Sequence, residues 1–271
     1  MKNYQRALTI AGSDSGGGAG IQADLKTFAA LGCYGFSVIT ALTAQNTLGV
    51  TAIEPVSAHF VEQQLEAVLT DIGVDAVKIG MIHSPDIIRT VAAKLQHYRA
   101  PNIVLDPVMI AKSGDRLLQE EAVQALTKLL LPLAAVITPN LPEAAVLLGR
   151  PRPPENLEEM EQAARELSRL GPAAVLLKGG HLEGARSPDL LYQRQEERVT
   201  LLDGSRVPTA NTHGTGCTLS SAIAAGLARG LDLAAAVHRA KEYLTGALQK
   251  GAAYRLGSGH GPVHHFWEHW S

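Results

Sequence analysis

A glycine-rich segment with one cysteine stands directly before a run of small residues late in the chain. The segment is Asn211–Cys217, and helical spacing follows it. Glycines let the backbone approach a ligand closely, and the free amides at the start of a helix attract an anion. We expect Gly214 and Gly216 to hold a transferring phosphoryl group, with Cys217 as the thiolate that accepts a proton. A tight turn with a small buried cysteine explains the segment equally well when it is taken alone.

Carboxylates and a lysine follow three predicted strands. Asp106 follows one strand, Asn140 and Glu143 follow the next, and Lys178 ends a third. Oxygen ligands suit Mg²⁺, and a lysine at this position can neutralise charge on a transferred phosphoryl group. Asn140 and Glu143 also have the spacing of a helix capping box, and the two roles can coexist.

A second group of residues could line a pocket for a flat, nitrogen-rich ring. Gly12, in the first glycine-rich loop, allows close approach, and Asp24 could accept a hydrogen bond from a substrate amine or hydroxyl. Gln45 offers an acceptor and a donor pair, which suits an aminopyrimidine, and Met81 could lie against its ring. Each residue also has an ordinary alternative: an acid near a helix start, a capping amide or a methionine in the core.

Short buried strands alternate with helices along most of the chain. This alternation predicts a mostly parallel sheet with helices on both faces and ligands beyond the carboxyl ends of the strands. Two β-like runs between Leu190 and Pro208 predict an antiparallel edge hairpin, and the aromatic tail 259–267 is expected to pack on the domain. The predicted strands are 6–11, 35–42, 76–79, 103–105, 134–137 and 173–177, and the predicted helices are 21–31, 60–72, 85–98, 118–130, 141–148, 157–170, 216–229 and 233–249.

The composition favours a globular enzyme with a small substrate. With 46% hydrophobic residues, the 271 residues can form one large α/β domain, which we expect to span 1–271. A net charge of -2 leaves no basic surplus for nucleic acid, and no segment looks like a signal peptide or a membrane span. Cys33 and Cys217 are far apart, and no histidine has ligand spacing, so we expect a reduced cytoplasmic setting without zinc or disulfides.

Taken together, these segments strongly resemble the hydroxymethylpyrimidine kinase and phosphomethylpyrimidine kinase family of bacterial thiamine biosynthesis, a branch of the ribokinase superfamily. The resemblance runs from end to end, and the order of the motifs is highly specific. It implies an α/β, ribokinase-like three-layer sandwich in a single domain. The resemblance is carried by Thr9–Asp24, Thr43–Thr47, Asp106–Met109, Lys112–Gly114, Thr138–Asn140, Lys178–His181 and Asn211–Cys217.

The resemblance implies an enzyme that phosphorylates 4-amino-5-hydroxymethyl-2-methylpyrimidine, and then its monophosphate, with ATP and Mg²⁺. It also implies a homodimer, since family members commonly form dimers. Cys217 falls on the position of the base. The family's pyrimidine pocket falls on Gly12, Asp24, Gln45 and Met81, and its ATP, magnesium and anion-hole positions fall on Asp106, Asn140, Glu143, Lys178, Thr215 and Gly216.

Other functions compete with this interpretation. Sugar kinases of the superfamily resemble the site but carry aspartate where this chain has Cys217, so the cysteine favours the pyrimidine and pyridoxal branch. A pyridoxal or pyridoxine kinase of vitamin B6 salvage is the nearest alternative, and Gln45 favours the pyrimidine. A binding protein without turnover is disfavoured, because Lys178 and the whole Gly214–Cys217 turn are present.

Overall fold

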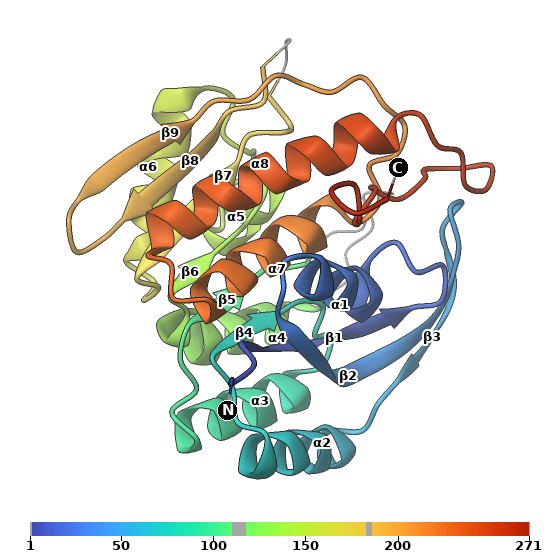
Figure 1. Ribbon diagram of the computed structural model, residues 1–271. Helices are drawn as coiled ribbons and strands as arrows, with labels where there is room; N and C mark the ends of the chain where they lie inside the picture. The colour runs from blue at the N-terminus through green and yellow to red at the C-terminus, as the bar shows by residue number, and fades with distance from the viewer. Residues whose placement is uncertain (1, 110–117, 183–185, 271) are drawn as a thin grey trace.

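The structure is a computed structural model that describes residues 2–109, 118–182 and 186–270 (Figure 1). The Lys112–Gly114 motif therefore lies outside the described residues. Nine strands form one sheet in the order β3-β2-β1-β4-β5-β6-β7-β8-β9. Within the described part of the chain, no helix combines the length and the apolar character needed to cross a membrane.

The centre of the sheet is parallel, as the alternation of strands and helices predicts. Most of these strands are buried, which is the pattern of a sheet with helices on both faces. Their carboxyl ends lie at one edge of the sheet, where the predicted site residues follow them. The parallel strands are β1 (Arg6–Asp14), β2 (Tyr34–Gln45), β4 (Ala76–Ile79), β5 (Ile103–Leu105), β6 (Val136–Ile137) and β7 (Ala174–Lys178).

Antiparallel strands extend the sheet at both ends. The predicted edge hairpin is confirmed as β8 (Asp189–Gln193) and β9 (Arg198–Leu202). At the other end, β3 (Val50–Pro55) pairs with β2 and was not predicted. All residues of β3 are exposed, so this strand lacks the buried apolar alternation by which a strand is recognised in a sequence.

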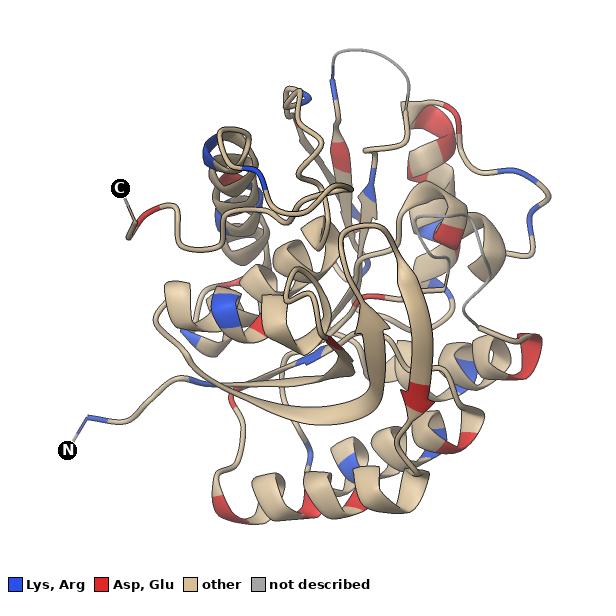
Figure 2. Cartoon of the chain, turned by 90° about the vertical axis from the view of Figure 1, so that its right-hand side faces the viewer, with Lys and Arg blue, Asp and Glu red and all other residues tan. Residues whose placement is uncertain are grey.

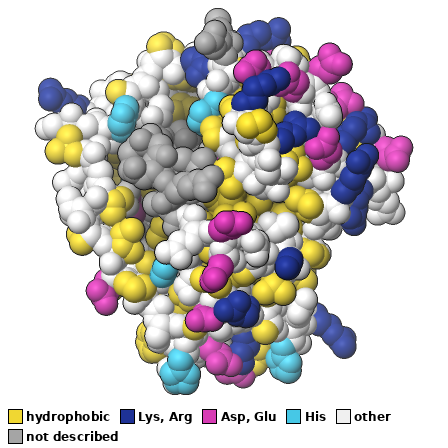
Figure 3. All heavy atoms as spheres, turned by 180° about the vertical axis from the view of Figure 1, so that it is seen from behind, with side chains coloured by type: hydrophobic (Ala, Val, Ile, Leu, Met, Phe, Trp, Pro, Cys, Tyr) yellow, Lys and Arg dark blue, Asp and Glu magenta, His cyan; other side chains and the backbone are white. Residues whose placement is uncertain are grey.

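Helices cover both faces of the sheet, and each layer has its own apolar core. Figure 1 shows α7 and α8 crossing the near face, where they pack with α1. On the opposite face, which Figure 3 shows, acidic and basic side chains are mixed on the surface. The near layer contains α1 (Gly20–Ala30), α7 (Thr215–Ala228) and α8 (Leu233–Gly251), and the other contains α2 (Ala58–Asp71), α3 (Pro85–His97), α4 (Glu120–Ala125), α5 (Leu141–Leu147) and α6 (Leu157–Ser168).

Two segments refine the expectations from the sequence. The predicted helix 118–130 is α-helical only in α4; a π-helical segment, Leu126–Leu130, and a 3₁₀ turn, Leu131–Leu133, follow it. Pro132 lies in that turn and cannot continue an α-helical ladder, because it has no amide proton. The C-terminal tail packs as predicted: Trp267 lies against Tyr243 of α8, with 6.5 Å between ring centroids.

Candidate active site

Helix α7 starts where the two glycine-rich segments touch. Gly214 precedes the helix with φ +80°, a left-handed conformation that disfavours any residue with a Cβ. A Cβ at this position would also overlap the carbonyl oxygen of Gly18. Among the described residues no side chain caps α7, so the amides of Gly216 and Cys217 can bind an anion.

An aspartate and a histidine join the same two segments through their side chains. Asp14 accepts backbone hydrogen bonds from Gly16, Gly18 and Ala19 at 2.8 to 3.0 Å, and its Oδ2 lies 2.9 Å from Nε2 of His213. Burial opposes the charge on this carboxylate. The bonds from His213 and the loop amides outweigh burial and lower the pKa of Asp14. The carboxylate therefore stays charged and holds the first loop against the turn before α7.

Three of the four residues predicted for the pyrimidine pocket come from neighbouring strand ends. A Cβ on Gly12 would lie 2.7 Å from Cε of Met81, so the methionine packs directly on the bare backbone. The side-chain oxygen of Gln45 accepts a hydrogen bond from Thr43 at 3.2 Å, and its Nε2 lies 3.3 Å from Nε2 of His213. These contacts fix the direction of the Gln45 amide beside the turn before α7.

Asp24, the fourth residue of that group, lies in the interior instead. Its side chain is fully buried, and both oxygens bind the ammonium of Lys78 at 2.8 and 2.9 Å. Thr9 and Ser221 donate two more hydrogen bonds to the carboxylate, at 2.6 and 2.7 Å. The expected substrate contact at Asp24 does not fit this placement, because protein donors already occupy both carboxylate oxygens.

The residues predicted for phosphate and metal meet on the other side of the α7 start. Oδ1 of Asp106 accepts hydrogen bonds from Lys178 and Thr138, each at 2.9 Å, and Ser220 of α7 approaches Oδ2 at 3.4 Å. A Cβ on Gly216 would lie 3.4 Å from both Oδ2 of Asp106 and Nζ of Lys178. A lysine, a carboxylate and the first turn of a helix therefore converge on one point.

Asn140 and Glu143 form the capping box that their spacing suggested. Each side chain accepts a hydrogen bond from the backbone amide of the other, at 2.8 Å. Burial raises the pKa of Glu143 to about 7; Lys178 opposes this rise, and the charge of Asp106 adds to it. The pKa of Asp106 is lowered despite burial, chiefly by the charge of Lys178 and then by that of Lys78.

These two carboxylates fit a cation that arrives with phosphate better than a resident ion. The described residues contain no cluster of three histidine, cysteine or acidic side chains that could hold a metal. Asp106 and Glu143 nevertheless lie close enough for the charge of one to shift the pKa of the other. Mg²⁺ needs only one or two protein carboxylates when substrate phosphates and water complete its shell.

Cys217 lies in the first turn of α7, as expected, and its thiol is protonated at neutral pH in the ligand-free protein. Burial raises the pKa of its thiol to about 11, although Lys78 and the amide of Gly20 lower it. The role of Cys217 as a thiolate base stays a prediction for the protein with phosphate and a cation bound. Desolvation at this position outweighs the field of the helix N-terminus.

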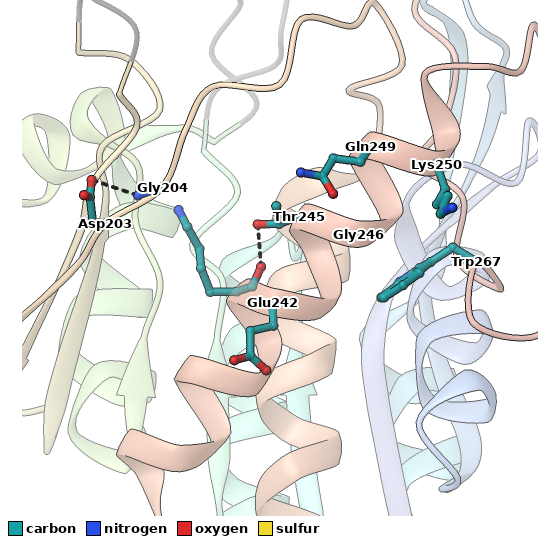
Figure 4. Close-up of a pocket in the computed structure, with 9 residues that line it drawn as sticks. Asp203, Gly204, Glu242, Thr245, Gly246, Gln249, Lys250 and Trp267 are labelled. Atoms are coloured by element: carbon teal, nitrogen blue, oxygen red, sulfur yellow. Dashed lines mark hydrogen bonds between the residues drawn. The ribbon is translucent and has the colours of Figure 1, made fainter.

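A separate cavity of about 390 Å³ opens between α8 and the segment after β9. Figure 4 shows Thr245, Gln249 and Glu242 on one side, with Asp203 and Gly204 across from them. None of the predicted site residues lines this cavity. Lys241, which does line it, forms an ion pair with Asp189.

The family of the chain follows from comparison with known proteins. Residues 14–264 match the family model described as phosphomethylpyrimidine kinase. The chain belongs to the phosphomethylpyrimidine kinase family. It is therefore a kinase with ATP as co-substrate, and the family and fold class expected from its motifs are confirmed.

Relatives resemble the chain over nearly its whole length. The hydroxymethylpyrimidine/phosphomethylpyrimidine kinase of Rhizobium meliloti (strain 1021) is 54% identical, and the match covers 97% of this chain and 98% of the relative. The crystal structure of phosphomethylpyrimidine kinase from Clostridium difficile 630 superposes with a TM-score of 0.80 at 48% identity, covering 90% of this chain and 99% of the other. The pyridoxal kinase of Staphylococcus aureus in complex with AMP-PCP and pyridoxal gives a TM-score of 0.88 at 35% identity, with 98% and 94% covered.

Sequence reasoning missed two pairs of residues beside the site. The pair of Asp14 and His213 joins segments 199 residues apart, which no local spacing reveals. The pair of Asp24 and Lys78 had a visible signal, because a lysine interrupts the otherwise apolar strand β4. A charge at a buried strand position requires a partner, and this requirement could have directed attention to Lys78.

We predict that Gly214→Ala abolishes most turnover, whereas Gly230→Ala spares it. Both glycines have a positive φ, +80° and +83°, so alanine costs about 1–2 kcal/mol of backbone strain at either position. A Cβ at Gly230 meets no atom within 4 Å, whereas a Cβ at Gly214 must push Gly18 away. Thermal unfolding and kcat, measured on both variants, separate strain from loss of the site. Equal losses of kcat in the two variants would refute a special role for the contact of the two glycine segments.

Proposed function

We propose that the chain phosphorylates 4-amino-5-hydroxymethyl-2-methylpyrimidine with ATP, and then phosphorylates the monophosphate to the diphosphate, for thiamine biosynthesis. The observation that carries the proposal is the convergence of Lys178, Asp106 and the first turn of α7 around Gly216. This arrangement suits phosphoryl transfer, in which catalysis consists mainly of positioning and charge neutralisation. The names of the relatives supply the substrate.

In this proposal the first turn of α7 and Lys178 share the charge of the transferring group. The amides from Gly214 to Cys217 face the phosphoryl oxygens, and the ammonium of Lys178 lies beside them. Asp106 keeps that ammonium in place through a 2.9 Å ion pair. Asp106 and Glu143 would hold Mg²⁺ with the phosphates of ATP, and the metal would supply further charge neutralisation.

The acceptor hydroxymethyl group is assigned to the space between Cys217 and the pocket of Gly12, Gln45 and Met81. Cys217 takes the hydroxyl proton in its thiolate form, so the first step depends on how much thiolate is present. In the second step the acceptor is a phosphate that is largely ionised at neutral pH. That step therefore depends on positioning rather than on a base.

The direct test is to incubate the protein with ATP, Mg²⁺ and either the aminohydroxymethylpyrimidine or pyridoxal, and to follow the products by mass. Formation of pyrimidine monophosphate and then diphosphate supports both steps. Pyridoxal phosphate as the only product would overturn the substrate assignment. ATP consumption without any phosphorylated ring would overturn the kinase mechanism.

We predict that the first step accelerates with pH and that Cys217→Ala removes this dependence. Since the pKa of the thiol is raised to about 11, its thiolate fraction grows about tenfold per unit between pH 8 and 10. Loss of a general base lowers kcat about 10²- to 10⁴-fold, with little change in KM. The second step should lose much less. Initial rates of both steps across this pH range provide the measurement, and a normal first-step kcat in Cys217→Ala would exclude the cysteine as base.

A second activity on pyridoxal is favoured by the likeness to the Staphylococcus aureus pyridoxal kinase, which was solved with pyridoxal bound.

We predict that Gln45→Leu lowers kcat/KM for the aminopyrimidine about 10- to 100-fold and changes it less for pyridoxal. The reason is that a polar partner of the pyrimidine amine is lost at little cost in volume. Competition between the two substrates in one reaction measures the change directly. An equal loss for both would remove Gln45 from the specificity determinants.

The proposal includes a homodimer that forms through the end of the sheet at β3. Tyr34, Leu42, Val50 and Ile53 expose apolar side chains on β2 and β3. Figure 2 turns these two strands toward the viewer, and Glu54 is their one charged residue. An exposed, apolar edge of this kind is a typical interface between subunits.

We predict that Ile53→Asp converts a dimer into a monomer, because a carboxylate in an apolar interface loses its hydration. Light scattering coupled to size exclusion gives the mass. Leu231→Asp is the matched control, since Leu231 is exposed at the turn between α7 and α8. A wild-type monomer would refute the dimer.

A cytoplasmic location and a single domain over 1–271 complete the proposal. Both cysteines are free, which suits a reducing compartment. All described strands join one sheet, so the described part of the chain offers no second sheet around which another domain could form.

A further inference from the structure

Lys78 is a buried charge for which the proposed function does not account. It lies within β4, where all four residues are buried, and its side chain has no exposed surface. Its partner Asp24 has no exposed surface either, and among the ion pairs of the described residues only this one has two fully buried side chains. Because taking two charges out of water is costly, such a pair is rarely the most stable solution for a core. The charges therefore call for an explanation other than stability.

The ion pair is bonded directly to the helix that carries the proposed base. Oδ1 of Asp24 accepts a hydrogen bond from Ser221 at 2.7 Å. Ser221 lies four residues after Cys217 in α7, which is about one helical turn. A displacement of the Lys78 ammonium would therefore move a contact of α7 that lies one helical turn from the Cys217 thiol.

The ammonium also lies next to the predicted substrate pocket. A Cβ on Gly80 would come within 2.6 Å of Nζ of Lys78, so the charge sits against the backbone just before Met81. Lys78 lowers the pKa of the Cys217 thiol, whereas Asp24 and Asp106 raise it. The positive charge of Lys78 therefore lowers the pKa of the thiol from the protein interior, on the side of the site away from solvent.

We propose that Lys78 is a positioning residue for phosphoryl transfer: with Asp24 it anchors the start of α7 and keeps a fixed positive charge beneath Cys217. The inference rests on the proposed function of the site. The charge is permanent: burial lowers the pKa of Lys78, but the negative charges of Asp24 and Asp106, together with the hydrogen bonds to Asp24, keep this pKa raised. In this role Lys78 contacts neither substrate. It acts through its anchoring of α7 and through the electrostatic effect of its charge on Cys217.

Two single variants test the proposal because they should change the thiol in opposite directions. Lys78→Met leaves Asp24 charged and should slow alkylation of Cys217 by iodoacetamide about tenfold, the equivalent of one pKa unit. Asp24→Asn leaves Lys78 charged and should speed alkylation of Cys217 about threefold, the equivalent of about half a pKa unit. The measurement is the rate of labelling of the Cys217 peptide by mass spectrometry, with the ligand-free full chain at pH 8.5.

The chain contains its own control for unfolding. Cys33 is buried at the far side of the α7 layer, so its labelling reports loss of the fold. Lys94→Met is the matched lysine control, since Lys94 pairs with glutamates on α2 away from the site. Lys94→Met should leave labelling and turnover unchanged.

In Lys78→Met we expect kcat to fall about tenfold and KM to stay within about twofold, as for a lost transition-state effect.

If both single variants expose Cys33, the double variant Lys78→Met/Asp24→Asn decides, because it leaves no unpaired buried charge. Slower labelling of Cys217, together with a lower kcat, supports the proposal in this background. Labelling and turnover at wild-type rates overturn it, as do shifts in the same direction in the two single variants with Cys33 protected. The thiol measurement needs no substrate, so it stands even if the wild-type protein fails to phosphorylate the pyrimidine.

Discussion

The contact between the two glycine-rich segments is the constraint on which the site depends. Helix α7 can begin where it does only because Gly214 adopts a left-handed conformation against the carbonyl of Gly18. This contact places the free amides of α7 beside the loop that follows β1. The pair of Asp14 and His213 secures it with side chains, and His213 in turn lies against Gln45. The turn before α7, which is proposed to bind the phosphoryl group, and the predicted pocket for the ring are thus parts of one packed unit.

Two ion pairs with little or no exposed surface lie around this unit. Lys178 stands between Asp106 and the first turn of α7, while Lys78 and Asp24 form a second pair deeper in the core. Each carboxylate is held by donors before any ligand binds, so little reorganisation is needed when phosphate arrives. Glu143 differs: burial raises its pKa to about 7, so its charge responds to its surroundings near neutral pH. A cation at this point would favour the charged form.

The sequence predicted the parts of this architecture that depend on local pattern. The parallel centre, the hairpin of β8 and β9 and the position of Cys217 at a helix start follow from strand alternation and glycine spacing. Strand β3 was missed because its residues are exposed, so neither burial nor alternation marks it. The placement of Asp24 was missed for the opposite reason. Proximity to a helix start suggests a surface acid, and only the fold brings Lys78 of another strand to its carboxylate.

The pKa of Cys217 shows why a motif identifies a residue better than it predicts the residue's chemistry. A helix N-terminus favours a thiolate, but this effect falls off within one turn and competes with desolvation, which grows with burial. Here desolvation prevails, and the thiol is a weak acid in the free protein. A weak acid is a strong base once ionised, which suits removal of a proton from an alcohol. A fixed charge such as that of Lys78 makes the ionised form accessible without exposing the site to water.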